Sequence, residues 1–197
     1  ALSVGSASAG GTGVFRDQAA CPFKAFAVHR LSAQSPGEPR DLDSADRGTL
    51  VHKLLDKVWR ELKSSDALKK LSERDLEALI HIAVDTALNS VRWRRPEALS
   101  GKLGTLERER LIGIAKAWLL VERERPEFEV VALEQKEALQ FGGLTVNAKL
   151  DRMDRILNVE GGAWAVIDYK TGRASAGDWL GPRPNEPQLP LNAAGAR

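Results

Sequence analysis

Apolar residues recur at the spacing of a helix through the first two thirds of the chain and alternate with polar residues after Pro126. A helix repeats every 3.6 residues and a strand every two, so this pattern predicts helices before the proline and strands after it. The predicted strands cover residues 128–139, 144–157 and 164–170, with turns at residues 141–143 and 158–162. Strands that follow a set of helices indicate an α/β or α+β domain.

Three long helices are predicted before the strands. The first covers residues 44–62, and the third covers residues 102–125 and is ended by Pro126. Ser72 is the predicted N-cap of the second helix, which has Asp75 at its third position and ends by Pro96. The residues expected to face the core from the third helix are Leu103, Leu106, Leu111, Ile114, Ala115, Trp118 and Leu119.

The two ends of the chain have a different character. Residues 1–13 are small, polar and rich in glycine and serine, so we expect a flexible segment followed by one domain over residues 14–197. Residues 14–31 are predicted to be helical, with Pro22 either kinking this helix or starting a second one. Residues 32–43 form a predicted loop, and residues 186–194 begin a final helix. The apolar stripe expected in the first helical stretch is Phe15, Ala19, Phe23, Phe26, Ala27 and Val28.

Composition narrows the class of protein. A chain of 197 residues with 43% hydrophobic and 28% charged residues is typical of one soluble globular domain. No apolar run is long enough to cross a membrane, and no signal-peptide pattern opens the sequence. The single cysteine, Cys21, excludes an internal disulfide framework and favours a reducing cytoplasm. The net charge of +2 neither demands nor excludes nucleic acid as a partner, because a local basic patch matters more than the total.

The last two predicted strands carry the most informative polar residues. Asp151 lies on the first of them, and Asp168 and Lys170 share a face at the end of the second. The two strands are expected to be antiparallel, which can bring Asp151 close to Asp168. Two carboxylates at one end of an apolar sheet are unfavourable unless positive charge lies between them. Lys170 and a divalent metal ion are the two candidates for that charge.

Single residues in this set have simpler interpretations. His52 stands at the margin of the apolar stripe of its helix, where a lone histidine indicates a solvated or hydrogen-bonded side chain. Asp151 alone indicates a strand-end charge paired with Arg152 or Arg155. An apolar strand that ends in Asp168-Tyr-Lys170, with both charges on one face, is more typical of an active site.

Five motifs, in order along the chain, resemble those of the PD-(D/E)XK nuclease superfamily. They are Gln18-Ala-Ala-Cys-Pro-Phe-Lys-Ala-Phe26, Gly48-x-x-x-His52, Lys149-Leu-Asp-Arg-Met-Asp154, Val166-Ile-Asp-Tyr-Lys-Thr-Gly172 and Gln188-Leu-Pro-Leu191. More narrowly, they resemble the nuclease domains of RecB and AddB helicase–nucleases and of related bacterial DNA-repair proteins. The resemblance covers residues 14–191 and implies an α/β fold with a restriction-endonuclease-like core, in which helices flank a mixed central β-sheet.

The resemblance also implies cleavage of DNA phosphodiester bonds that depends on Mg²⁺ or Mn²⁺. The implied metal ligands are His52, Asp151, Asp168 and the backbone carbonyl of Tyr169, and the implied catalytic residues are Asp151, Asp168, Lys170 and Gln188. Hard divalent ions prefer carboxylate oxygens, and a bound ion activates water and neutralises charge on the phosphate. Lys170 would position or help deprotonate the attacking water, and Gln188 would help hold the substrate and the active site. An imidazole ligand shifts the preference toward Mn²⁺.

Two further carboxylates accompany the motifs. Glu134, on the preceding strand, is either an outer carboxylate of the site or a solvent-facing residue paired with Lys136. Asp154 is expected to pair with Arg152 or Arg155 and not to bind metal.

The sequence departs from the family pattern at two positions. The glutamine motif usually continues Gln-x-x-x-Tyr, but Asn192 stands there and five residues remain, so we expect either a changed motif or a fragment of a longer protein. Several relatives bind an iron–sulfur cluster through four cysteines, which Cys21 alone cannot supply within this chain. We expect Cys21 to be a buried apolar residue. No Walker-type motif is present, so an ATPase motor would belong to another part of the protein or to a partner.

The densest basic cluster is Arg92-Trp93-Arg94-Arg95, whose tryptophan could stack on a base. Its alternative role is to place cations at a helix C-terminus. Lys24 and Arg173 are further candidates for phosphate contacts, which are largely independent of DNA sequence. The resemblance implies a cytoplasmic bacterial DNA nuclease of repair or recombination, with DNA and a helicase or ATPase as partners. The alternative is a catalytically inactive DNA-binding or structural module of a helicase–nuclease-like assembly.

Overall fold

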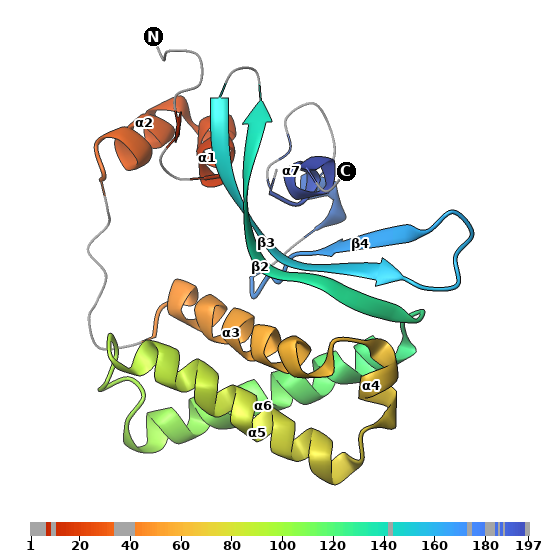
Figure 1. Ribbon diagram of the computed structural model, residues 1–197. Coiled ribbons are helices and arrows are strands. Elements are labelled where there is room, and N and C mark those ends of the chain that lie inside the picture. Colours follow the sequence, from red (N-terminus) through yellow and green to blue (C-terminus); the bar gives the residue numbers. More distant parts are fainter. Residues whose placement is uncertain are drawn as a thin grey trace.

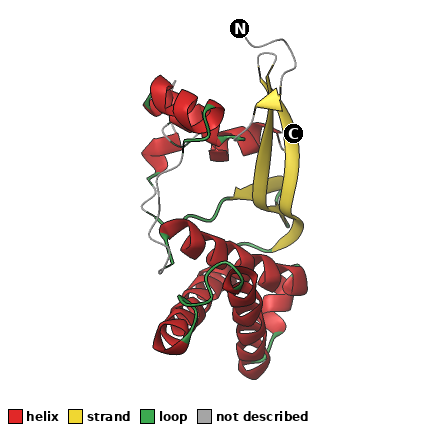
Figure 2. Ribbon diagram, turned by 90° about the vertical axis from the view of Figure 1, so that its left-hand side faces the viewer, coloured by secondary structure: helices red, strands yellow, loops and turns green. Residues whose placement is uncertain are grey.

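A layer of helices and a twisted sheet meet along helix α3 (Ser44–Leu62) (Figure 1). The computed structural model describes residues 7–8, 11–33, 42–141, 144–172, 175–179, 184, 186 and 188–195. Helices α5 (Glu73–Arg92) and α6 (Gly101–Glu124) lie on the side of α3 that faces away from the sheet (Figures 1 and 2). The predicted mixed α/β architecture is confirmed.

Helix α3 begins and ends where the sequence predicts. The side chain of Asp43 accepts a hydrogen bond of 2.7 Å from the backbone N–H of Asp46, which satisfies one of the free donors at the helix start. Lys63 follows the helix in the left-handed conformation, with φ of 60°. Leucines 50, 54 and 55 are fully buried, and the ring of Trp59 packs edge-on against Phe128, with 5.4 Å between the ring centroids. This contact joins the helical core to the first long strand.

The second long helix also has the predicted cap, since the hydroxyl of Ser72 accepts a hydrogen bond of 3.1 Å from the N–H of Asp75. A short helix that the sequence pattern did not predict, α4 (Ser65–Lys70), precedes it. Its N-cap is Ser64, whose hydroxyl accepts a hydrogen bond from the N–H of Ala67, and the helix buries Leu68. Six residues are too few to produce a recognisable helical period, which explains why the pattern did not predict it.

The predicted inward face of α6 is wrong at its first two turns. Leu103 is 56% exposed and Leu106 is 60% exposed. The buried row of α6 instead runs through Glu107, Leu111, Ala115 and Leu119. Glu107 can occupy a buried position because its carboxylate pairs with the guanidinium of Arg110. A search for apolar residues alone cannot identify a row that begins with a neutralised glutamate.

An ion-pair network joins the end of α5 to the start of α3. Arg95 donates a hydrogen bond of 2.8 Å through Nε to the buried carboxylate of Asp46, and its Nη2 lies 3.4 Å from Asp43. The same two aspartates form the N-terminal cap of α3. Arg95 therefore holds a helix terminus in place, and Arg92 lies in the last turn of α5 as the helix-end alternative requires.

Pro22 starts a second helix, which is one of the two alternatives predicted from the sequence. Helix α1 (Gly13–Ala20) ends before it, and α2 (Pro22–Arg30) begins with it, because proline lacks the N–H that a first-turn residue leaves unpaired. The expected apolar stripe is not buried, since Phe23 is 75% exposed and Phe26 is also exposed. Cys21 is exposed as well and does not have the buried position expected of it.

A buried carboxylate holds α1 and α2 together. Asp17 is 2% exposed and pairs with Lys24 at 2.9 Å and with His29 at 2.8 Å, both from α2. The Lys24 hydrogen bond outweighs the opposing effect of burial and, with His29 and Arg16, lowers the pKa of Asp17 to about 2. The link between these two short helices is thus polar, which the apolar pattern did not indicate.

The sheet is centred on β3 (Leu144–Ile156). Strand β2 (Phe128–Phe141) pairs with it in antiparallel orientation, and β4 (Ala163–Ile167) pairs antiparallel with its second half. Strand β1 (Ala7–Ser8), from the segment expected to be flexible, pairs in parallel with residues 145–146, so the sheet is mixed. The three long strands match the predicted ones within a few residues, whereas residues 142–143 of the predicted first turn lie outside the described part of the chain.

The last strand ends three residues earlier than predicted, at Ile167. The N–H of Tyr169 donates to the side chain of Asp151 on β3, so the chain leaves the backbone ladder at this point. A 3-10 turn (Ala176–Trp179) and the final helix α7 (Gln188–Gly195) follow, and α7 packs against β3 and β4. No helix within the described residues is both long and apolar enough to span a membrane.

We predict that Asp17→Asn destabilises the α1–α2 pair in a pH-dependent manner. The folded pKa of Asp17 lies below its unfolded value, so the ionised carboxylate stabilises the pair above about pH 4, and this effect disappears as the pH falls toward about 2. Hydrogen exchange of the α1 and α2 amides should show a loss of about 1 to 2 kcal/mol of protection in the variant at about pH 6, and little loss near pH 2. An equal loss at both pH values would contradict this account.

Replacement of Arg95 by alanine should lower the free energy of unfolding by about 2 kcal/mol, because it leaves the buried Asp46 carboxylate without its main partner. Urea denaturation measures the change. Arg92→Ala is the matched control, since Arg92 is exposed and its loss should change stability by less than about 0.5 kcal/mol. Equal effects of the two substitutions would show that the network does not stabilise α3.

Candidate active site

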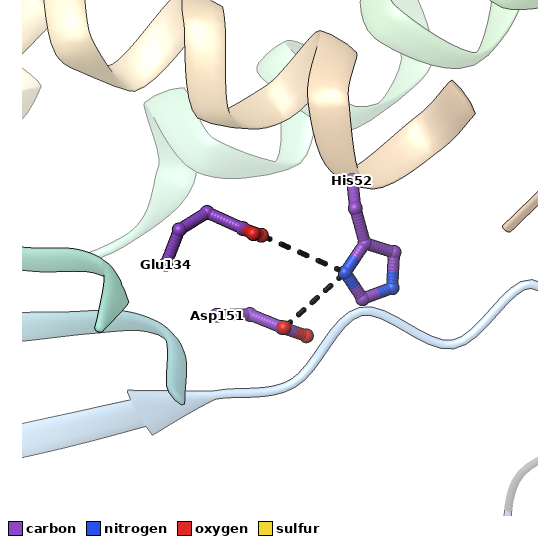
Figure 3. A group of neighbouring side chains, drawn as sticks. All are labelled: His52, Glu134 and Asp151. Carbon is purple, nitrogen blue, oxygen red and sulfur yellow. Dashed lines mark ion pairs between the residues drawn. The ribbon is translucent and has the colours of Figure 1, made fainter. Parts of the chain in front are cut away.

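Three potential metal ligands converge where α3 faces the β2–β3 hairpin (Figure 3). They are His52 on α3, Glu134 on β2 and Asp151 on β3, and one ligand atom from each lies within 4.8 Å of the others. The imidazole Nδ1 of His52 lies 3.2 Å from Oδ1 of Asp151 and 3.9 Å from Oε1 of Glu134. One imidazole nitrogen and two carboxylates form a donor set that suits a divalent cation.

The orientation of His52 is fixed by its other ring nitrogen. Nε2 lies 2.8 Å from the carbonyl oxygen of Tyr169, which can only accept a hydrogen bond, so Nε2 is the donor. In the neutral ring, Nδ1 then carries the lone pair that points at Asp151 and Glu134. A lone pair beside two carboxylates requires a cation between them, either a proton or a metal ion. Burial lowers the pKa of His52, but Asp151 and the Tyr169 carbonyl outweigh it and leave this pKa above its ordinary value.

Glu134 reaches this group through an unusual backbone conformation. It lies opposite Asp151, between the pairs Leu133–Arg152 and Gln135–Leu150, and its φ is 51°. A left-handed φ is uncommon for glutamate and is often found at functional sites. Its side chain is 10% exposed and pairs with Lys149, not with Lys136, so the solvent-facing alternative is wrong. The structure places Glu134 directly beside His52.

Asp151 is held by two partners from opposite directions. Its Oδ1 faces His52, and its Oδ2 accepts a hydrogen bond of 2.9 Å from the backbone N–H of Tyr169. Burial raises the pKa of Asp151, but His52 and the Tyr169 N–H together lower it below its ordinary value. The carboxylate is therefore ionised and available to a cation. The alternative of pairing with Arg152 or Arg155 is wrong, since both of these arginines bond to other carboxylates.

Asp168, Lys170 and Gln188 form a second group next to the first. Lys170 Nζ lies 3.0 Å from Asp168 Oδ2 and donates to Gln188 Oε1 at 3.2 Å, and Gln188 Nε2 donates to Asp168 Oδ1 at 3.1 Å. Three polar contacts thus close a ring among these side chains. Burial and the nearby Asp151 raise the pKa of Asp168 in spite of Lys170. The two carboxylates predicted to approach one another do so.

Several of the residues predicted to contact DNA pair with carboxylates of the protein itself. Arg94 and Arg95 pair with Asp46, although Trp93 is 78% exposed and Arg94 lies over its ring. Lys24 pairs with Asp17. Arg173 lies outside the described residues. The structure therefore gives part of the basic cluster a role in stability.

Two features of the site were not found from the sequence. Lys149 belongs to a quoted motif, but its pairing with Glu134 depends on the register of two strands. The side chain of Tyr169 is buried, and its ring packs edge-on against that of His52 with 5.8 Å between centroids. The signal for Tyr169 was its place between Asp168 and Lys170, where alternation turns it toward the core.

The predicted pairing of Asp154 with Arg152 or Arg155 is confirmed for Arg152. Asp154 also bonds to Arg125, whereas Arg155 pairs with Glu129. Asp154 is fully buried among these guanidinium groups and lies outside the group of three potential ligands.

Comparison with known families agrees with the geometry of the site. The sequence matches the PD-(D/E)XK nuclease superfamily over residues 14–197, which is nearly the whole chain. No curated protein matches it. The mixed sheet flanked by helices fits the fold of that superfamily, and the five motifs lie within the matched range. This chain belongs to the PD-(D/E)XK nuclease superfamily.

Proposed function

We propose that this protein is a divalent-metal-dependent nuclease that hydrolyses phosphodiester bonds in DNA. The observation that carries the proposal is the convergence of His52, Glu134 and Asp151 beside Lys170 at the junction of α3 and the sheet. A buried carboxylate pair and an imidazole lone pair aimed at it form a polar site whose charge balance improves when a cation binds. Membership of a nuclease superfamily supports the same reaction.

The residues that would hold the cation are His52 through Nδ1, together with Glu134 and Asp151, with Asp168 adjacent to them. Mg²⁺ and Mn²⁺ are the ions proposed, because both accept carboxylate oxygens and Mn²⁺ accepts imidazole more readily. When bound, such an ion would supply a water of lowered pKa and positive charge for the phosphate oxygens. The Tyr169 carbonyl has a lone pair remaining beyond its bond to His52 and is a further candidate ligand.

We propose that Lys170 orients the attacking water and stabilises the negative charge that develops on the phosphate. Its ammonium has three N–H donors, of which Asp168 and Gln188 receive two. The third can orient a water molecule or bind a phosphate oxygen, where a positive charge stabilises the transition state. An ammonium cannot accept a proton, so Lys170 acts by orientation and charge in this form.

We propose that Gln188 fixes the side chains of Lys170 and Asp168 relative to each other. Its amide donates to the carboxylate and accepts from the ammonium, so one planar group fixes both. Because Gln188 is the first residue of α7, the position of that helix determines the geometry of this contact.

The wider role is proposed from the closer motif resemblance to RecB-type and AddB-type nuclease domains. It comprises DNA repair or recombination in a bacterial cytoplasm, with a helicase or ATPase as partner. A catalytically inactive DNA-binding module is the alternative. The polar contacts of Lys170 with Asp168 and Gln188 favour the nuclease, since a module that only binds DNA does not require this arrangement.

We predict that Lys170→Ala abolishes metal-dependent cleavage. The rate of cutting of end-labelled linear DNA with Mg²⁺ or Mn²⁺ should fall by at least about 10²-fold. The reason is that the variant lacks the ammonium that orients the attacking water and stabilises the charge on the phosphate. EDTA should abolish cutting by the wild type, and circular DNA distinguishes endonuclease from exonuclease action.

The matched control is Lys69→Ala, which removes an exposed lysine of α4 and should leave the rate unchanged. Cutting by Lys170→Ala at the wild-type rate would overturn the assignment. Absence of cutting by the wild type, together with Mn²⁺ binding that Asp151→Ala and Asp168→Ala abolish, would indicate an intact site that needs a partner. Absence of both cutting and Mn²⁺ binding would support the inactive module.

His52→Asn should weaken binding of Mn²⁺ more than binding of Mg²⁺. The imidazole nitrogen favours Mn²⁺, whereas an amide oxygen is a harder ligand. Calorimetric titration of both ions should show Mn²⁺ affinity lowered by about 10-fold or more, with a smaller change for Mg²⁺. Glu134→Gln should weaken both ions by similar factors. If His52→Asn leaves the ratio of the two affinities unchanged, His52 is not a ligand.

A further inference from the structure

A cluster of four charged side chains, three of them buried, is linked to the proposed metal site through Tyr169. Arg152 and Asp154 come from β3, and Glu122 and Arg125 come from the end of α6 and the residue after it. Arg152 and Asp154 are completely inaccessible to solvent, and Glu122 is nearly so. Two guanidinium groups and two carboxylates give the cluster no net charge.

Arg152 directs four of its N–H donors to the carboxylates of this cluster and the fifth to the hydroxyl of Tyr169. Nε donates to Asp154 Oδ1 at 2.6 Å and Nη2 donates to Asp154 Oδ2 at 2.7 Å. The same Nη2 donates to Glu122 Oε2 at 3.1 Å, and Nη1 donates to Glu122 Oε1 at 3.2 Å. The remaining hydrogen of Nη1 points to the hydroxyl of Tyr169, 3.5 Å away. Its guanidinium carbon lies 3.8 Å from the ring centroid of Trp59 and 4.7 Å from that of Phe128.

A lysine cannot reproduce this set of contacts. It has three donors on one atom, whereas two bidentate carboxylates and a hydroxyl require five in a fixed plane. Ion pairs buried to this degree are weak evidence for stability, because the cost of removing charges from water offsets their attraction. The geometry of the cluster is therefore better explained by what it positions.

Tyr169 connects the cluster to the metal site. Its ring packs edge-on against Trp118, whose Nε1 donates to Glu122, and against His52. Its backbone N–H and carbonyl bond to Asp151 and His52 respectively. The side chain of Tyr169 thus belongs to the cluster, while its backbone holds two of the three proposed ligands.

We infer that Arg152 is a positioning residue that fixes Tyr169 and, through its backbone, sets the geometry of Asp151 and His52. Its chemical task is to present an ionised carboxylate oxygen and an imidazole nitrogen to a divalent cation at a fixed separation. The part of this inference that concerns metal rests on the proposed function. The part that concerns Tyr169 does not.

The test compares Arg152→Lys with Arg125→Lys. Arg125 pairs with the same Glu122 and Asp154 and packs on Phe128, so it serves as a control for damage to the cluster itself. Hydrogen exchange of the Tyr169 amide, relative to the amide of Leu54 in the core of α3, reports the bond to Asp151 without any metal. Mn²⁺ affinity, measured by titration, reports the ligand geometry.

Arg152→Lys should accelerate relative exchange of the Tyr169 amide and weaken Mn²⁺ binding by about 10-fold, as loss of outer support does at other metal sites. Arg125→Lys should change neither, beyond what its lower stability explains. Tyr169→Phe keeps the ring and removes only the hydroxyl, so it tests the same link if Arg152→Lys fails to fold. It should produce a smaller change in the same direction.

Unchanged relative exchange at Tyr169 in both Arg152→Lys and Tyr169→Phe would overturn the inference, as would equal effects of the two arginine substitutions. Faster exchange in Arg152→Lys, combined with no Mn²⁺ binding by the wild type, would retain the positioning role and reject the proposed metal site. The two failures are therefore distinguishable.

Discussion

The burial of negative charge at the junction of α3 and the sheet is the constraint on which this structure depends. Asp151, Asp154 and Glu122 are buried almost completely, and the Asp168 side chain is only 4% exposed. A buried carboxylate is unfavourable unless a cation or several hydrogen-bond donors compensate it. Each has such a partner within the fold, and the partners come from both layers. Helix packing, strand register and the path of the chain after β4 must all be correct for this compensation to exist.

The compensation divides the junction into two regions. Around Arg152 the carboxylates are paired with an equal number of guanidinium groups, so the charges of this region balance. Around His52 the carboxylates of Glu134 and Asp151 face a single imidazole and the ammonium of Lys149, so this region retains capacity for more positive charge. Tyr169 lies between the two regions, with its side chain in one and its backbone in the other. A rigid charge cluster next to a region that can accept a cation is a suitable arrangement for a preorganised metal site.

The sequence predicted the elements whose signal is local. The bounds of α3, the Ser72 cap and the break at Pro22 follow from periodicity, capping and the chemistry of proline. The order of motifs identified His52, Asp151, Asp168, Lys170 and Gln188, which the structure brings into two neighbouring groups.

Features that depend on distant pairing could not be decided from the sequence, which allowed two interpretations of Glu134 and of the basic cluster. The proximity of Glu134 to His52 requires one register of β2 on β3 and a left-handed φ, and the role of Arg95 requires the end of α5 to reach the start of α3. The exposure of Phe23 and Cys21 does not follow from the sequence, because apolar character alone does not guarantee burial.

The bond between His52 and the carbonyl of Tyr169 joins residues that are 117 positions apart, and Gln188 lies further still along the chain. Proteins are synthesised from the N-terminus, so a contact between distant residues can form only after the later residue has been synthesised. Helix α3 would therefore leave the ribosome long before the strands that complete its site, and α7 would follow those strands. During synthesis, the growing chain would carry His52 without its carboxylates. The complete site would exist only once the sheet had docked, so an immature chain would lack the arrangement that the finished protein uses.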